Sequence, residues 1–333
     1  MKKIKKFIVY IIFIYLFVRL FQIGFTSKII STFAEDTQLE KVPYQEFDYG
    51  QFQTVKLLHT ETGEVEVLPL DIYLYGVVSA EMPANFEMEA LKAQAIVART
   101  YTIYQMANNH KHQEQGADIC DSPLCCQAWI SKENRIARWE KEEAEQKWTK
   151  IENSVNATIG KIILYENQPI KAFFHSNSGG ITESSLNVWG GDYSYLQSVQ
   201  TVGEENYDSY ESEVKISKDE LIVKMKEKFE DFEINFEQED WIKIVEKTDT
   251  SSRVNKIQIG NKVITGNEAR SILGLKSTKF EIKVDKDDIY FYVLGYGHGV
   301  GMSQCGSDSL AKQGMNCEEI IHHYYQNVEI VSY

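Results

Sequence analysis

Proline and cysteine are scarce in this chain of 333 residues, which holds five of each. So little cysteine excludes a disulfide-dense scaffold, and so little proline excludes a collagen-like chain. Neither an internal repeat nor a low-complexity tract is present. Hydrophobic residues make up 43% and charged residues 25% of the chain, which is the usage of a globular protein and not of an intrinsically disordered one.

Positive charge is also in short supply, with 35 Lys and Arg against 49 Asp and Glu. Five of the basic residues and none of the acids lie in residues 1–25, so the rest of the chain carries a formal charge of −19. Such a surface repels a phosphate backbone, and we expect no nucleic-acid partner.

The N-terminus has the pattern of a membrane anchor. Four of residues 1–6 are lysines, and in residues 7–25 only Arg19 and Gln22 interrupt apolar or small side chains. A helix of that length is about 28 Å long and can cross a hydrocarbon core of about 30 Å. The lysines place residues 1–6 in the cytoplasm and the remainder outside the cell membrane.

A cleaved signal peptide is the alternative to this anchor. It lacks support because no A-x-A-like cleavage site closely follows the apolar run, and the candidate site Thr32-Phe33-Ala34 lies too far beyond the end of that run. We therefore expect an uncleaved single-pass anchor at 7–25, a polar stalk at 26–48, and one domain at 49–333 with a smaller lobe at about 204–290.

The domain is expected to be α+β, because helical and strand signals alternate without a βαβ rhythm. Strand signals predict hairpins that turn at Thr62-Gly63, at residues 166–169 and at Gly260-Asn261. Helix signals predict four features: a helix capped by Asp71 and ending near Ala80, one capped by Asn85 and ending near Met106, an amphipathic helix over residues 135–155, and capping boxes at Ser217 and Thr265.

Glu81 is an isolated carboxylate in apolar surroundings, within Val77-Val78-Ser79-Ala80-Glu81-Met82-Pro83. Desolvation and the negative end of a helix dipole both raise a carboxyl pKa, which suits a general acid. The alternative is a partly exposed glutamate at a helix end.

Two glycine-rich segments could form the walls of a site. His175-Ser176-Asn177-Ser178-Gly179-Gly180 follows a buried-looking strand, and Gly295 to Gln304 surrounds His298 with glycines. Both could approach a sugar or peptide closely, although a tight turn and a flexible surface loop are the respective alternatives. The second segment is too irregular for a dinucleotide-binding fingerprint.

Together these stretches resemble the stage II sporulation protein D family of membrane-anchored peptidoglycan lytic transglycosylases. The resemblance spans residues from about 50 to the end. It rests on the following motifs in order: Tyr73-Leu74-Tyr75-Gly76-Val77-Val78, Ala80-Glu81-Met82-Pro83, Ala90-Leu91-Lys92-Ala93-Gln94-Ala95, Ala98-Arg99-Thr100-Tyr101, residues 175–180, Val188-Trp189-Gly190 and residues 297–304.

The resemblance implies that Glu81 is the catalytic acid. It also implies a set of substrate-binding residues, consisting of Lys92, Arg99, His175, Ser176, Asn177, Ser178, Glu183, Tyr296, His298 and Gln304. For Lys92 and Arg99, a solvated face or a structural ion pair remains the alternative.

The implied reaction cleaves the bond between N-acetylmuramic acid and N-acetylglucosamine in glycan strands, expected to be free of stem peptides. Ordinary glycosidases use two carboxyl groups. Here Glu81 would protonate the leaving oxygen and then deprotonate the C6 hydroxyl of the muramic residue, which attacks its own anomeric carbon to give a 1,6-anhydro end. A nucleophile on the same sugar has a high effective concentration, so one carboxylate suffices.

The resemblance also implies a structural zinc site in the loop containing Cys120, Cys125 and Cys126. Thiolates and imidazoles are natural zinc ligands, and His110 or His112 would complete the set. Cys125 stands where a histidine is usual in the family, and a disulfide from Cys120 to Cys125 or Cys126 is the alternative. Cys305 also departs from the family pattern, which has an aromatic residue there.

Two other functions remain open. A cysteine transpeptidase or peptidase could use Cys305 with His298, and a non-catalytic wall-binding scaffold would need the sugar-contacting loops without Glu81. The resemblance further implies a role in engulfment during endospore formation, in the mother-cell membrane, with a sporulation amidase and a polytopic membrane protein as partners.

Overall fold

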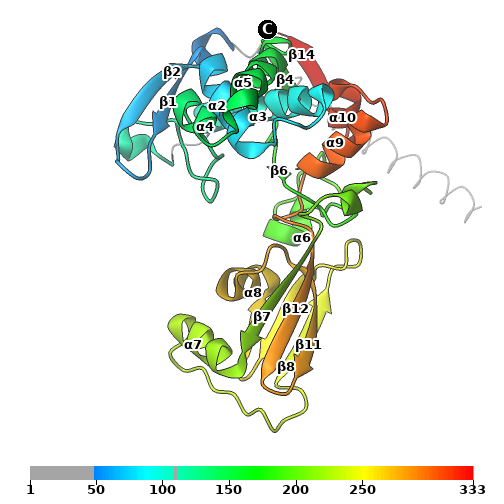
Figure 1. Cartoon of the computed structure of the whole chain (residues 1–333). Helices are drawn as coiled ribbons and strands as arrows, with labels where there is room; N and C mark the ends of the chain where they lie inside the picture. The colour runs from blue at the N-terminus through cyan, green and yellow to red at the C-terminus, as the bar shows by residue number, and fades with distance from the viewer. Residues whose placement is uncertain (1–48, 109–110, 333) are drawn as a thin grey trace, which may run out of the picture. The chain divides into compact units, whose positions relative to one another are not determined.

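The computed structural model describes residues 49–108 and 111–332 (Figure 1). Helices and strands are mixed, which confirms an α+β fold. Within these residues no helix has the length and hydropathy to cross a membrane. The predicted tail, anchor and stalk at residues 1–48 lie outside the described part of the chain.

The described chain begins with a short 3₁₀ turn, Tyr49–Phe52, and the first predicted hairpin, β1 (Thr54–Leu58) with β2 (Val65–Pro69). Helix α2 (Leu70–Glu81) follows directly. Its N-cap is Pro69, so the prediction that Asp71 caps it is wrong: Asp71 lies in the first turn, where its carboxylate pairs with a distant arginine.

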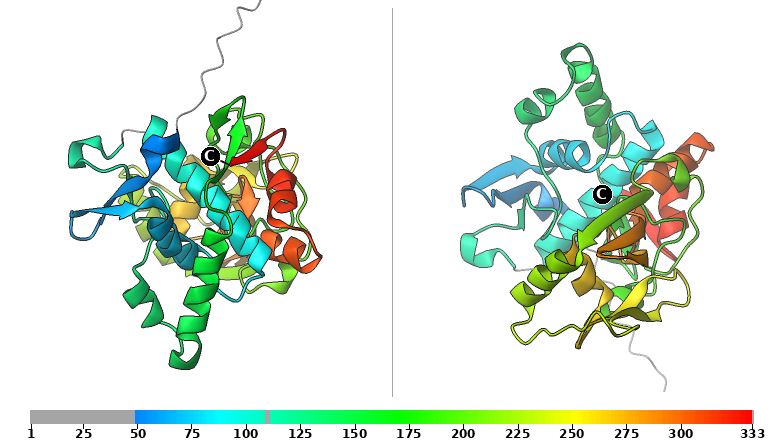
Figure 2. Two further views of the ribbon diagram at one scale, coloured as in Figure 1. Left: turned by 90° about the horizontal axis from the view of Figure 1, so that it is seen from above. Right: turned by 60° about the horizontal axis from the view of Figure 1, so that its bottom comes forward.

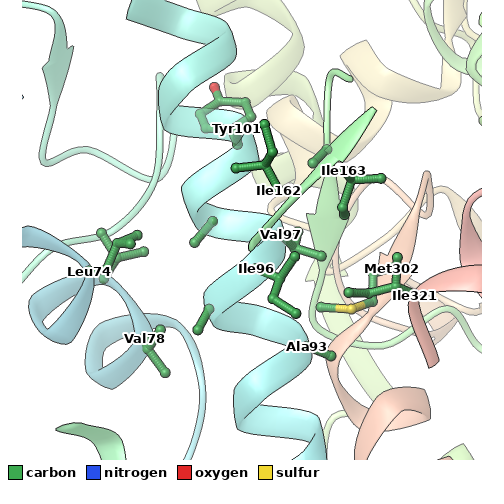
Figure 3. Close-up of a cluster of buried hydrophobic side chains, with 14 of the residues drawn as sticks. Leu74, Val78, Ala93, Ile96, Val97, Tyr101, Ile162, Ile163, Met302 and Ile321 are labelled. Atoms are coloured by element: carbon green, nitrogen blue, oxygen red, sulfur yellow. The ribbon is translucent and has the colours of Figure 1, made fainter. Parts of the chain in front are cut away.

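Helix α3 (Met88–Asn108) lies at the centre of the first hydrophobic core. It begins three residues after Asn85, so the prediction that Asn85 is its N-cap is wrong. Four alanines of α3 are buried, Ala90, Ala93, Ala95 and Ala98, and they let α2, α5, α9 and α10 pack close to its backbone. The course of the ribbon around α3 can be followed in the two views of Figure 2. Figure 3 shows the result: Ala93, Ile96 and Val97 project from α3 among side chains from α2, β4 and the C-terminal segments.

Two predicted elements differ from the structure. Residues 132–156 form two helices, α4 (Lys132–Ile136) and α5 (Lys141–Asn156), and not one, because Glu140 takes an extended conformation between them. The hairpin after β4 (Lys161–Tyr165) turns at Glu166 and Asn167, both at positive φ, and returns as β5 (Gln168–Pro169). The turn thus occupies two residues and not the four predicted.

The remaining elements of the first core join segments far apart in the sequence. Strand β3 extends the first hairpin, β14 pairs with β4, and β6 pairs in parallel with β13. The bounds are β3 (Ile119–Cys120), β6 (Phe174–His175), α6 (Ser185–Trp189), β13 (Met302–Ser303), α9 (Gln304–Lys312), α10 (Cys317–Tyr324) and β14 (Glu329–Ser332), with 3₁₀ turns at Gln113–Gln115 and Glu204–Asn206.

A second hydrophobic core is built from residues between Ile216 and Val293. It contains two antiparallel three-stranded sheets, β11-β12-β7 and β10-β9-β8, with helices α7 and α8 (Figure 1). The bounds are β7 (Glu211–Ser217), α7 (Lys218–Lys228), β8 (Ile242–Lys247), β9 (Val254–Ile259), β10 (Lys262–Thr265), α8 (Gly266–Leu273), β11 (Lys279–Asp285) and β12 (Asp288–Leu294).

Short-range sequence signals correctly predicted one turn and one capping box in this second core. The β9–β10 turn lies at Gly260-Asn261, as predicted. Thr265 and Glu268 form the reciprocal capping box of α8, whereas Ser217 caps α7 from its side chain alone.

Candidate active site and metal centre

Glu81 is the last residue of α2, where the chain turns to an extended conformation at Met82 ahead of Pro83. Burial raises the pKa of Glu81 to about 6, although hydrogen bonds from the Ala128 N–H, at 2.6 Å from Oε1, and from the Gln304 side chain oppose the rise. A carboxyl group with this pKa can both donate and accept a proton near neutral pH.

Glu81 lies between two cavities of about 800 Å³ and about 670 Å³. Both are lined by Ala80, Glu81, Ser176 and Gln304. We call the two cavities together the groove. A linear polymer that occupied both cavities would pass Glu81, because Glu81 lines each of them.

The pairing of β6 with β13 brings the two glycine-rich segments together, although more than a hundred residues separate them in the sequence. Asn177 and Tyr296 form a further backbone bridge, and the Glu183 N–H donates to the Gly299 carbonyl. Their adjacency, which the sequence only suggested, is therefore fixed by backbone hydrogen bonds.

The two histidines of these segments are neutral groups at physiological pH. Desolvation, with a contribution from Arg253, lowers the pKa of His175 to about 3. Desolvation and the neighbouring His175 lower the pKa of His298 well below its usual value. His175 Nδ1 lies 3.2 Å from the Val300 carbonyl oxygen, and His298 Nδ1 accepts the Val300 N–H. Both rings therefore help to hold the second loop in place.

The predicted substrate-binding residues fall into two groups. Those that line the groove beside Glu81 are His175, Ser176, Tyr296, His298 and Gln304. Asn177, Ser178 and Glu183 are fully buried and take their hydrogen bonds from the protein itself. They do not line the groove.

Lys92 and Arg99 do not line the groove either. Lys92 pairs with Glu89 at 2.7 Å. Arg99 is buried, pairs with Asp71 at 3.0 Å and donates to the Thr158 carbonyl at 2.7 Å. These contacts fit the alternative left open for them, a structural ion pair.

Sequence reasoning missed a buried carboxylate, Glu204, that organises the first loop. Glu204 Oε1 accepts the Ser178 N–H and Oε2 accepts the Gly180 N–H, at 3.0 and 2.8 Å. The hydroxyls of Ser178, Thr201 and Ser303 donate to the same carboxylate. Ser303 is the N-cap of α9, so Glu204 connects the loop to the helix that carries Gln304. No local sequence signal marks it.

Arg253 was also missed. Its guanidinium is buried, donates to the Ser178 carbonyl at 2.9 Å and lies so close to Gly299 that a Cβ there would be 2.4 Å from Cζ. Desolvation lowers the pKa of Arg253 to about 10, and Glu183 and Glu204 favour its charge. Arg253 thus ties both glycine-rich loops to the second core.

The cysteine loop brings four potential metal ligands together, His112, Cys120, Cys125 and Cys126, whose ligand atoms lie within 4.8 Å of one another. His112 Nε2 is 3.3 Å from Cys125 Sγ and 3.6 Å from Cys126 Sγ, and the latter sulfurs are 3.7 Å apart. A tetrahedral zinc ion has ligands about 3.5–3.8 Å apart, given Zn–S of about 2.3 Å and Zn–N of about 2.0–2.1 Å. His110 lies outside the described residues.

All five cysteines lie within the described chain and are free thiols. Cys125 and Cys126 line the 670 Å³ cavity, so the candidate metal loop forms part of the groove wall. Cys305 lines the other cavity, and its Sγ is 3.2 Å from Ser209 Oγ. Burial raises the pKa of the Cys305 thiol, and His298 lines the opposite cavity. This arrangement does not support the cysteine peptidase alternative.

Comparison with known proteins shows the family to which this chain belongs. A family model described as Stage II sporulation protein matches residues 59–165, which contain Glu81 and the cysteine loop. Stage II sporulation protein D of Bacillus amyloliquefaciens is 35% identical over 277 residues, covering 83% of this chain and 78% of its own, and that of Bacillus subtilis is also 35% identical. The amidase enhancer of Bacillus subtilis is 26% identical over 40% of its length. The chain therefore belongs to the stage II sporulation protein D family.

Proposed function

We propose that the protein is a lytic transglycosylase that cleaves the bond between N-acetylmuramic acid and N-acetylglucosamine in peptidoglycan strands, leaving 1,6-anhydro ends, during engulfment in endospore formation. The observation that carries the proposal is the placement of Glu81 between two cavities with a pKa raised to about 6.

The proton moves twice in this reaction. The Glu81 carboxylic acid protonates the glycosidic oxygen as the bond to the anomeric carbon breaks. The resulting carboxylate then takes the proton of the C6 hydroxyl as that oxygen bonds to the anomeric carbon, which restores the acid. The Ala128 N–H and Gln304 stabilise the carboxylate between the two steps.

A single carboxylate serves because the nucleophile belongs to the substrate. Among described residues, Glu81 is the one acid lining the 670 Å³ cavity. In the other cavity Glu143 is paired with Lys147 at 2.6 Å, which leaves Asp208 as the acid a hydrolase could use to activate water.

Zinc in the cysteine loop is part of the proposal. His112, Cys120, Cys125 and Cys126 would hold it as a closed four-ligand site, and the Lys111 ammonium hydrogen-bonds to Cys125 and offsets the charge of the thiolates. When bound, the ion would fix the loop that carries Ala128 and forms the groove wall, a structural role.

The proposed location follows from the sequence. Residues 7–25 would anchor the protein in the mother-cell membrane during engulfment, with the N-terminus in the cytoplasm and the catalytic domain outside it. A sporulation amidase and a polytopic membrane protein are the proposed partners, and similarity to a protein named amidase enhancer supports the link to an amidase. Carbonate extraction and protease accessibility of intact cells test this topology.

The products test the reaction. Full-length protein is incubated with peptide-free glycan strands, and the products are analysed by mass spectrometry. Ends one water lighter than hydrolysis products are expected, and predominantly reducing muramic ends would refute the proposal.

Two variants assign the acid. Glu81→Gln is expected to lower turnover by roughly a hundredfold or more, since it keeps the shape and removes the titrating proton. Asp208→Asn separates the two mechanisms, because a hydrolase would lose as much activity from it and a transglycosylase would lose less than about tenfold. A folded Glu81→Gln protein that keeps more than about one-tenth of the turnover would count against Glu81.

A further inference from the structure

Arg270 is a cation that the proposed reaction leaves without a role. It lies on α8 in the second core and lines the 670 Å³ cavity that also contains Glu81. Among the described residues lining this cavity, Arg270 is the one Lys or Arg. Arg135 and Lys147 line the other cavity, so Arg270 is the cation of the half that the cysteine loop borders.

Arg270 has no anionic partner among residues 49–108 and 111–332. Its Nε donates to the Leu275 carbonyl at 3.4 Å, and no carboxylate in this part of the chain lies within 4.0 Å of its guanidinium. Desolvation lowers the pKa of Arg270, yet an arginine side chain stays charged in proteins. In a chain of net charge −14, a partly buried arginine that lines a cavity and has no carboxylate within ion-pair distance can bind an anion supplied by the ligand.

The surroundings of Arg270 suit a sugar that carries such an anion. Asn267, one turn earlier on α8, donates to the Val188 carbonyl, so this face of α8 lies against α6 (Figure 1). Trp189 of α6 and Tyr296 line the same cavity and are 46% and 41% exposed. Exposed aromatic rings offer apolar faces on which a pyranose ring can stack.

We propose that Arg270 is a specificity-determining residue that binds the lactyl carboxylate of a muramic acid residue. The inference rests on the proposed function and deepens it. In a strand without stem peptides the lactyl group ends in a free carboxylate, which a guanidinium can bind through two parallel hydrogen bonds. A stem peptide converts this carboxylate into a neutral amide. Arg270 therefore selects strands from which the peptides have already been removed.

The test measures binding without cleavage, in full-length Glu81→Gln protein. Isothermal titration compares three tetrasaccharides: one with free lactyl carboxylates, one with the same groups converted to methylamides, and a chitotetraose without lactyl groups. The carboxylate ligand is expected to bind roughly tenfold or more tightly than the methylamide, as for a hydrogen bond to a charged group. Adding Arg270→Gln should reduce this preference to less than about twofold, and Arg270→Lys should leave an intermediate preference.

Lys276 provides the matched control, because it is an exposed cation whose Nζ lies over the Tyr296 ring, 4.4 Å from its centroid, and it does not line the cavity. Lys276→Gln should keep the carboxylate preference. Equal binding of the first two ligands, or a preference that survives in both Arg270 variants, would overturn the role of Arg270 and leave the transglycosylase proposal intact. Failure of all three ligands to bind would overturn both.

Discussion

Replacing Glu204 by glutamine removes one charge and changes no shape, and it should destabilise the first loop. Each carboxylate oxygen of Glu204 accepts one backbone N–H, from Ser178 on one side and from Gly180 on the other. Whichever way a glutamine amide is oriented, its NH₂ group faces one of these donors, and a backbone N–H cannot rotate away. The neighbouring hydroxyls can rotate to donate elsewhere, so they contribute less to the loss of stability.

The expected cost follows from this geometry. One charge-assisted hydrogen bond is lost and one buried N–H is left without an acceptor, which together cost about 2–4 kcal/mol. Urea denaturation of full-length Glu204→Gln protein measures the loss. Glu205→Gln is the control, because Glu205 is the exposed neighbour in the same turn and should change the free energy of unfolding by less than about 0.5 kcal/mol. Equal stability of the two variants would refute the argument.

The remaining predictions concern Glu81, Gly299 and the cysteine loop. The pKa of Glu81 is about 6 in the folded protein against 4.5 for the reference group. The stability that the protonated group contributes is therefore present below pH 4.5 and is lost as pH rises through 6. Glu81→Gln should raise the free energy of unfolding by about 2 kcal/mol at about pH 8 and leave it unchanged below pH 4.5. Gly299→Ala should displace Arg253 and lower the free energy of unfolding by about 1–3 kcal/mol more than Gly314→Ala does. Gly314 is the control because it also has a positive φ but has open space around it. Equal losses of stability in urea denaturation would argue against the steric contact. Elemental analysis should find about one zinc per chain, and chelation should lower the unfolding temperature; less than about 0.2 zinc with a Cys120 disulfide in the mass spectrum would contradict the site.

Local sequence patterns correctly predicted the turns and caps that depend on short-range interactions. The first hairpin, the β9–β10 turn and the capping box at Thr265 all depend on residues a few positions apart. The predictions that Asp71 and Asn85 are N-caps failed because a residue caps a helix only if the helix begins directly after it. Asp71 instead pairs with Arg99, which lies 28 residues along the chain.

The sequence by itself determined the motifs that place Glu81 and the two glycine-rich loops in this family, because such motifs are contiguous. It also indicated the cysteine loop as a candidate metal site, but it left the choice between His110 and His112 open. Only the tertiary structure decided which of these residues face the groove. Lys92, Arg99, Asn177 and Ser178 belong to the motifs but hold the scaffold, whereas Glu204, Arg253 and Arg270 lie outside them and act on the loops or the groove. A buried ion or hydrogen bond depends on partners brought together by packing, and those partners are distant in the sequence.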